Sequence, residues 1–191
     1  MKTKIKCLTS VILTITMILS IIVVAPITVN ASEDDLTYGD FTYEVNNDGS
    51  CTITYYEGKS ADVSIPSTIC GHKVTKIGGA AFGYNESIKS VIVPNGVTNI
   101  DVGAFECCDN LTKVSLPDTI TYIDAYAFAY NEKLADISIP NDVEYVGESA
   151  FEETKWLNDQ PNGIVYAGKV AYIYKGTSWL NIKVSIKDGT K

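Results

Sequence analysis

Residues 88–110 read IKSVIVPNGVTNIDVGAFECCDN, residues 111–133 read LTKVSLPDTITYIDAYAFAYNEK, and residues 134–156 read LADISIPNDVEYVGESAFEETKW. The three segments are each 23 residues long and follow one another without a gap. A unit of this length cannot bury its own apolar face, so its neighbours must cover it. The period therefore predicts a solenoid. It favours a binding or display scaffold without naming a ligand.

Constant columns run down these segments. Each unit opens with alternating apolar residues, which is typical of a strand with one face inward, and a proline then ends the ladder because it has no N–H to donate. An earlier unit fits if five extra residues around Cys70–His72 form an exposed turn. The columns are Pro66, Pro94, Pro117 and Pro140; Ile77, Ile100, Ile123 and Val146; Ala81, Ala104, Ala127 and Ala150; and Phe82, Phe105, Phe128 and Phe151.

A fifth column holds a polar or thiol side chain three residues after each phenylalanine. Its members are Asn85, Cys108, Asn131 and Thr154. A polar side chain that points inward at the same corner of each repeat can form hydrogen bonds with the backbone groups of the turn. We therefore interpret Cys108 as a buried substitute for asparagine, whereas the alternative is a reactive thiol.

Units of the form L-x-x-I-x-I-P-x-x-V-x-x-I-x-x-x-A-F-x-x-C/N-x-x closely resemble the BspA-type (Treponema pallidum-type) leucine-rich repeats. The first unit, VSIPSTICGHKVTKIGGAAF (63–82), is similar to the first repeat of bacterial members. YEVNNDGSCTITYYEG (43–58) resembles their N-terminal strand cap, and WLNDQPNGIVYAGKVAYIYKG (156–176) resembles their hairpin insert. The resemblance implies a β-rich solenoid of a secreted or surface protein that acts in adhesion or binding. It offers no shared catalytic residues.

The first 31 residues are predicted to be a signal peptide. Lysines at positions 2, 4 and 6 precede the apolar run Leu8–Ala25, and a small-residue site ends at Ala31. This order predicts cleavage near Ala31 and a secreted or cell-surface protein. The alternative is an uncleaved anchor, because the apolar run approaches membrane-spanning length.

The mature chain is strongly acidic. Removal of residues 1–31 leaves 12 lysines, no arginine and 23 acidic residues, a formal charge of −11. This charge disfavours nucleic acid and anionic membrane as partners. The lack of arginine also removes the usual bidentate reader of phosphate.

We expect three parts after the signal peptide: an N-terminal β cap over 32–59, leucine-rich repeats over 60–157, and a β-hairpin insert with a partial final repeat over 158–191. The cap is predicted to be a hairpin that turns at Asn46–Gly49. The last unit opens at Asn181–Ile186 and stops before its Ala-Phe pair. The sequence thus predicts a truncated product, or an uncapped C-terminal edge at which chains associate end to end.

Cysteine and histidine usage argues against catalysis and metal binding. Export permits disulfides, and Cys51 and Cys70 are candidates for a bridge between the cap and the first repeat, although their pairing stays open. A bond between the adjacent Cys107 and Cys108 would be strained. One histidine, His72, and no Cys-x-x-Cys pair make a zinc site or a His-based triad improbable. The sequence predicts no catalytic, metal or cofactor site, and a hydrolase is the least supported alternative.

Two surfaces are candidates for recognition. The first is a concave face formed by the outward residues of the four strands: Asp62, Ser64, Ser90, Ile92, Lys113, Ser115, Asp136 and Ser138. Its area is of order 300 Å², which is short of the ~800 Å² per partner of a standard interface. The second is an aromatic surface of Tyr122, Tyr145, Trp156 and Trp179, which could stack on sugars or anchor a protein contact. Alternatively, these aromatics cover the edges of the solenoid.

The predicted function is adhesion or recognition outside the cell, without catalysis, with an extracellular protein or glycan as the partner. The alternative is a structural spacer in a larger surface or polysaccharide-degrading assembly.

Overall fold

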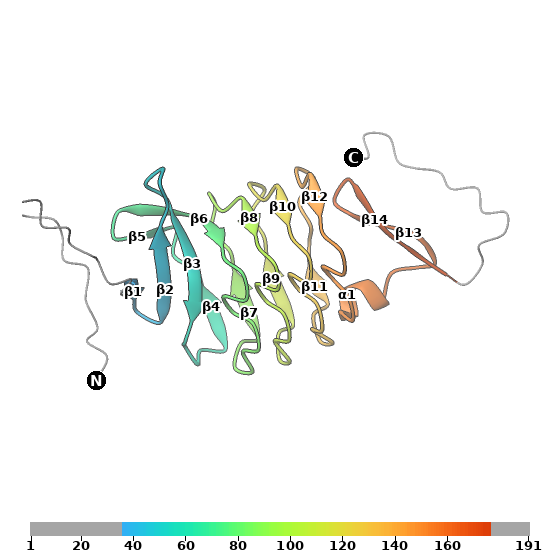
Figure 1. Ribbon diagram of the computed structural model, residues 1–191. Coiled ribbons are helices and arrows are strands. Elements are labelled where there is room, and N and C mark those ends of the chain that lie inside the picture. The colour runs from blue at the N-terminus through green and yellow to red at the C-terminus, as the bar shows by residue number, and fades with distance from the viewer. Residues whose placement is uncertain (1–35, 177–191) are drawn as a thin grey trace, which may run out of the picture.

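The alternating segments form short parallel strands that stack coil upon coil in the computed structural model, which describes residues 36–176 (Figure 1). One sheet contains β4 (Asp62–Ser64), β7 (Ser90–Ile92), β9 (Lys113–Ser115) and β11 (Asp136–Ile137), in the order β11-β9-β7-β4. All its pairs are parallel. The central valine of β7 is buried while Ile92 is exposed, as the alternation predicts. The predicted β-solenoid is confirmed.

A second parallel ladder lies on the other side of each coil. It is formed by β6 (His72–Ile77), β8 (Asn99–Ile100), β10 (Tyr122–Ile123) and β12 (Tyr145–Val146). Sequence reasoning placed apolar core residues here but no strands. Three of these strands are only two residues long, which is too short for an alternating pattern, and coil-to-coil pairing holds them.

The N-terminal cap extends this second ladder. β2 (Phe41–Val45) pairs antiparallel with β1 (Leu36–Tyr38) on one side and with β3 (Cys51–Tyr56) on the other, and β3 then pairs in parallel with β6. The predicted hairpin is thus present. Because β3 is hydrogen-bonded to β6, the first coil has no open strand edge on this side.

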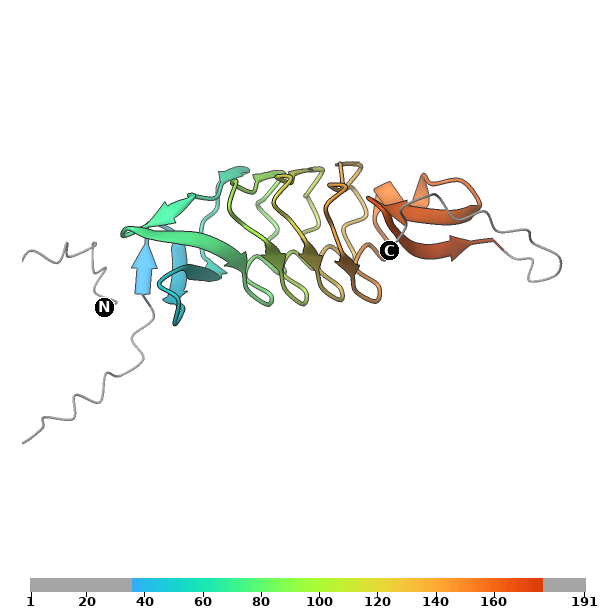
Figure 2. The same cartoon turned by 90° about the horizontal axis from the view of Figure 1, so that it is seen from above.

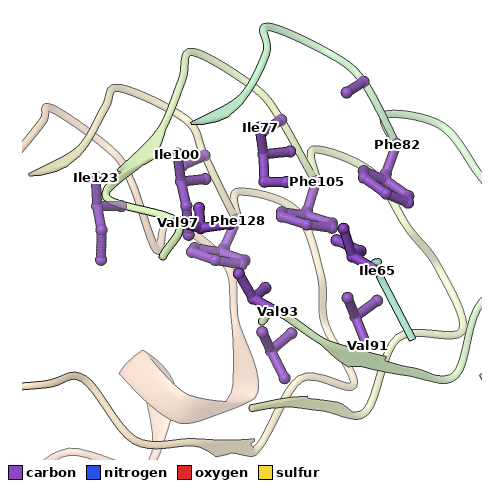
Figure 3. Packing of buried hydrophobic residues seen from close by; sticks show 14 of the residues in the cluster. Ile65, Ile77, Phe82, Val91, Val93, Val97, Ile100, Phe105, Ile123 and Phe128 are labelled. Atoms are coloured by element: carbon purple, nitrogen blue, oxygen red, sulfur yellow. The ribbon is translucent and has the colours of Figure 1, made fainter. Parts of the chain in front are cut away.

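The phenylalanine column forms the centre of the core. The rings of Phe82, Phe105, Phe128 and Phe151 stack at centroid distances of 4.8, 5.3 and 5.4 Å, and all four are at most 1% exposed. Figure 3 shows three of these rings in a row beside the row of Ile77, Ile100 and Ile123. Tyr56 of the cap stacks on Phe82 at 5.2 Å, so the aromatic column continues into the hairpin.

Each coil turns its corner through two left-handed residues. The φ angles at these positions lie between 52° and 62°. The two columns are Ala80, Gly103, Tyr126 and Ser149, and Tyr84, Cys107, Tyr130 and Glu153. This conformation costs roughly 1–2 kcal/mol for a residue with a Cβ. Hydrogen bonds to the next coil offset the cost: the Tyr84 N–H donates to the Glu106 carbonyl at 2.8 Å, and the Tyr130 N–H donates to the Glu152 carbonyl at 2.8 Å.

The C-terminal hairpin closes the last coil. In earlier coils the phenylalanine N–H donates to an alanine carbonyl of the next coil; for Phe128 this distance is 2.8 Å. Phe151 has no such coil after it, and its N–H donates to the Tyr172 hydroxyl at 3.1 Å. That tyrosine belongs to β14 (Val170–Lys175), which pairs with β13 (Gly163–Ala167). The hairpin lies against the end of the coils in both views (Figures 1 and 2).

The hairpin covers the core at the last described coil. The uncapped C-terminal edge was expected at the partial final repeat, and it stays a prediction. Val165 and Ala167 of the hairpin are buried in the core, and the short helix α1 (Lys155–Asn158) begins at the capping residue Thr154. Sequence reasoning predicted the hairpin but treated it as an insert and missed its role as a cover. The predicted signal peptide and the partial final repeat lie outside the described residues. Between residues 36 and 176, no helix is long and apolar enough to cross a membrane.

The extra residues of the first unit form a small hairpin between β5 (Thr68–Ile69) and β6. Its turn contains Cys70 with φ 49° and Gly71 with φ 88°, and Cys70 is exposed. Cys51, by contrast, is a free thiol that is fully buried in β3. A bridge between Cys51 and Cys70 is therefore wrong, because one side chain faces the core and the other stands on an exposed turn.

Candidate binding surfaces

The face predicted to be concave is the outer side of the four-stranded sheet. Strand pairing aligns Asp62, Ser90, Lys113 and Asp136 in one row and Ser64, Ile92 and Ser115 in the next, and Ser138 is also exposed. Figure 2 shows the coils stacked side by side in a row. The use of this face as a concave binding surface stays a prediction.

The polar groups on this face pair with one another. The Ser90 hydroxyl donates to the Asp62 carboxylate, and Lys113 Nζ lies 2.7 Å from an Asp136 oxygen. Both members of the ion pair are more than half exposed, so water screens it and it contributes little to stability. Ile92 is 53% exposed and is the one large apolar side chain in the rows. A ligand that hydrogen-bonds to Asp62 or Asp136 would compete with these contacts.

The second ladder carries a different row of side chains. Lys76, Asn99, Tyr122 and Tyr145 are in register on successive coils and point away from the core. The rings of Tyr122 and Tyr145 are stacked with centroids 4.5 Å apart and planes 12° apart. Two of the four predicted aromatic residues therefore form one surface feature.

A shallow, open groove of about 440 Å³ lies along this row. Its lining includes Lys76, Asn99, Asp101, Val102, Tyr122 and Asp124. Lys76 Nζ lies 3.3 Å from an Asp101 oxygen, and an Asp124 oxygen accepts the Ala125 N–H at 2.7 Å. The groove thus combines an aromatic ring, an amide, two carboxylates and one ammonium group.

Partial burial, and then the nearby Asp124 carboxylate, raise the pKa of the Tyr122 hydroxyl. That hydroxyl is therefore protonated at neutral pH and can donate a hydrogen bond. Sequence reasoning identified Tyr122 but missed Asp101 and Asp124, which stand two residues after the outward position of their coils. Their repetition at 23-residue spacing was the available signal.

The other two predicted aromatics do not join this surface. Trp156 packs against Phe151 with ring centroids 4.7 Å apart, at the end of the core column. It belongs to the closure of the last coil and is not stacked with Tyr122 and Tyr145. Trp179 lies outside the described residues.

The polar corner column ties neighbouring coils together. Asn131 is fully buried; its Oδ1 accepts the Cys108 N–H at 2.8 Å, and its Nδ2 donates to the carbonyls of Phe105 and Phe128 at 2.8 and 2.7 Å. Cys108 is its counterpart one coil earlier, with its thiol 3.2 Å from the Phe82 carbonyl oxygen. The interpretation of Cys108 as an asparagine substitute agrees with these contacts.

We expect the thiols to differ in accessibility. Burial raises the pKa of Cys108 to about 12, so at pH 8 only about one molecule in ten thousand carries the thiolate. Iodoacetamide on the native protein at pH 8 should modify the partly exposed Cys107 and leave Cys108 and Cys51 unmodified, as measured by peptide mass spectrometry. All three should react after unfolding. Equal labelling of Cys107 and Cys108 in the native protein would contradict this structural role.

The side chain of His72 contacts the backbone of the N-terminal cap. His72 Nδ1 lies 2.8 Å from the Gly49 carbonyl oxygen, so the ring connects β6 to the turn of the cap. In the part of the chain that the structure describes, no group of three or more His, Cys, Asp or Glu residues is placed to hold a metal ion.

Comparison with family models gives a match to the BspA type leucine rich repeat region over residues 54–175, which is more than half of the chain. The chain belongs to this family. The repeat pattern in the sequence and the coil geometry of the structure thus both agree with membership of this family. The comparison with curated proteins gave no match.

Several solved structures of bacterial leucine-rich-repeat proteins are similar. One from Bacteroides capillosus is 31% identical, with a TM-score of 0.59, and the match covers 65% of this chain and 94% of that one. The Treponema pallidum leucine-rich-repeat protein is 27% identical, with a TM-score of 0.51 and coverage of 59% and 64%. A third, from Bacteroides ovatus, is 25% identical, with a TM-score of 0.56 and coverage of 63% and 33%. The chain therefore spans about a third of the longest of these three relatives.

Proposed function

We propose that this BspA-type repeat protein is a secreted or cell-surface recognition protein that binds an extracellular partner without catalysing a reaction. The observation that carries the proposal is the outward row of Lys76, Asn99 and Tyr122, which continues into the stacked Tyr145. The buried phenylalanine column and the coil-to-coil hydrogen bonds hold this row rigidly. Fixed side chains lose little conformational entropy on binding, which favours recognition.

The mature chain's charge supports an extracellular role in binding. With 23 acidic residues and no arginine, the protein repels nucleic acid and anionic membranes. It also remains soluble outside the cell, where the predicted signal peptide would deliver it.

An array of glycans and extracellular host proteins tests this function. The purified protein, without the predicted signal peptide, should bind a reproducible subset of one class or the other. Substitution Ile92→Glu on the four-stranded sheet and Tyr122→Ala on the opposite ladder then show which face is used. Absence of binding to any glycan or protein on the array would contradict the proposal.

A spacer role is the second candidate, favoured by the continuous aromatic column. The stack runs from Tyr56 in the cap through four phenylalanines to Trp156, and it makes the coils a stiff rod. The match covers a third of the Bacteroides ovatus relative, so that chain is longer. If the protein is a spacer, it should bind no glycan or protein on the array specifically, so the same measurement separates the two functions.

A further inference from the structure

We propose that the groove beside Tyr122 binds a neutral pyranose unit of an extracellular glycan. This inference rests on the proposed function, since it specifies the ligand class of the same protein. It assigns the partner to one of the two classes that the sequence leaves open.

The first argument is the orientation of the tyrosine ring. One face of Tyr122 is stacked on Tyr145. Tyr122 lines the groove together with residues of the preceding coils, whereas Tyr145 does not line it. The free face of the Tyr122 ring is therefore turned towards the groove. The C–H-bearing face of a pyranose ring fits such a rigid aromatic platform, which offers apolar contact area with few rotatable bonds.

The second argument is the set of polar groups around that platform. Asp101 and Asp124 stand at equivalent positions of neighbouring coils, which are about 4.8 Å apart. Ionised carboxylates only accept hydrogen bonds, and the Asn99 amide can both accept and donate. Sugar hydroxyls both donate and accept, so they can satisfy all three groups. A mostly apolar peptide anchor would instead leave the carboxylates desolvated and unpaired.

The third argument is charge. The Lys76 ammonium group is already paired with Asp101, at 3.3 Å, and Asp124 receives a hydrogen bond from the backbone but has no cation among the lining residues. The groove therefore carries a net negative charge on a chain whose formal charge is −8 even with its signal segment. Uronate, sialate and sulfated sugars would be repelled. The net negative charge of the groove therefore favours a neutral sugar over an acidic one.

Affinity electrophoresis tests the groove, because it detects weak binding to polymers. Native gels would contain galactomannan, xyloglucan or mixed-linkage β-glucan, with polygalacturonate as the acidic polymer. The native protein should be retarded by at least one neutral polymer and not by polygalacturonate. Tyr122→Ala should weaken that binding about tenfold, whereas Tyr122→Phe, which keeps the ring, should change it by less than about twofold.

Tyr84→Ala is the matched control, because Tyr84 is 69% exposed and does not line the groove. It should leave retardation unchanged, and circular dichroism should show that all variants are folded. Retardation that survives Tyr122→Ala, or preference for polygalacturonate, would overturn the inference. If the array shows protein binding while no neutral polymer retards the native protein, the groove assignment is overturned and the proposed recognition function stands. If neither assay shows binding, both are overturned.

Discussion

Substitution Phe128→Ala is expected to destabilise the protein by about 3–5 kcal/mol. Phe128 is fully buried and stacks on Phe105 at 5.3 Å and on Phe151 at 5.4 Å. Its removal leaves a cavity in the middle of the column, and the rings on both sides lose a partner. The coils cannot collapse into the space, because hydrogen bonds between successive coils fix their spacing, as from the Phe128 N–H to the Ala150 carbonyl at 2.8 Å.

Urea unfolding followed by circular dichroism measures this loss, and the thermal midpoint should fall by roughly 10 °C. Phe128→Leu is the graded control, because leucine refills much of the volume and should cost less than about 1.5 kcal/mol. If alanine and leucine at position 128 gave the same stability, cavity formation would not be the cause. A loss below about 1 kcal/mol for the alanine variant would show that the column is not the centre of the core.

The core columns could be read from the sequence because a solenoid repeats its contacts. Every inward position recurs after 23 residues, so Phe105, Phe128 and Phe151 identify one another without any knowledge of the fold. The left-handed corners could not be predicted in this way. Tyr84, Tyr130 and Glu153 are not residues that favour positive φ. At Tyr84 and Tyr130, a hydrogen bond from the backbone N–H to the next coil supports this conformation.

Both terminal hairpins were predicted, but the residues that complete the core at the two ends escaped sequence reasoning for a related reason. Tyr56 takes the place of a phenylalanine in the cap, and the Tyr172 hydroxyl takes the place of an alanine carbonyl at the last coil. Neither residue lies at the repeat spacing, so no column contains it. The groove was predicted only in part: the tyrosine column could be read from the sequence, but the flanking Asp101 and Asp124 were not singled out, and the structure places them beside Tyr122.

Substitution Asn131→Ala is expected to cost about 3 kcal/mol, because three buried backbone groups lose a hydrogen-bond partner at about 1–3 kcal/mol each and the losses are not fully additive. The affected groups are the Cys108 N–H and the carbonyls of Phe105 and Phe128. These groups lie on two successive coils. The substitution therefore weakens the junction between coils as well as one turn.

The chain supplies its own control for this prediction. Cys108 holds the same corner one coil earlier, with its thiol 3.2 Å from the Phe82 carbonyl oxygen. Asn131→Cys should therefore recover at least half of the stability that Asn131→Ala loses, as measured by urea unfolding. Because a thiol is a weak donor and a weak acceptor, full recovery is not expected. Equal destabilisation by alanine and cysteine would show that Cys108 fills space without replacing the asparagine hydrogen bonds, and would refute the interpretation of this column as a hydrogen-bonding ladder.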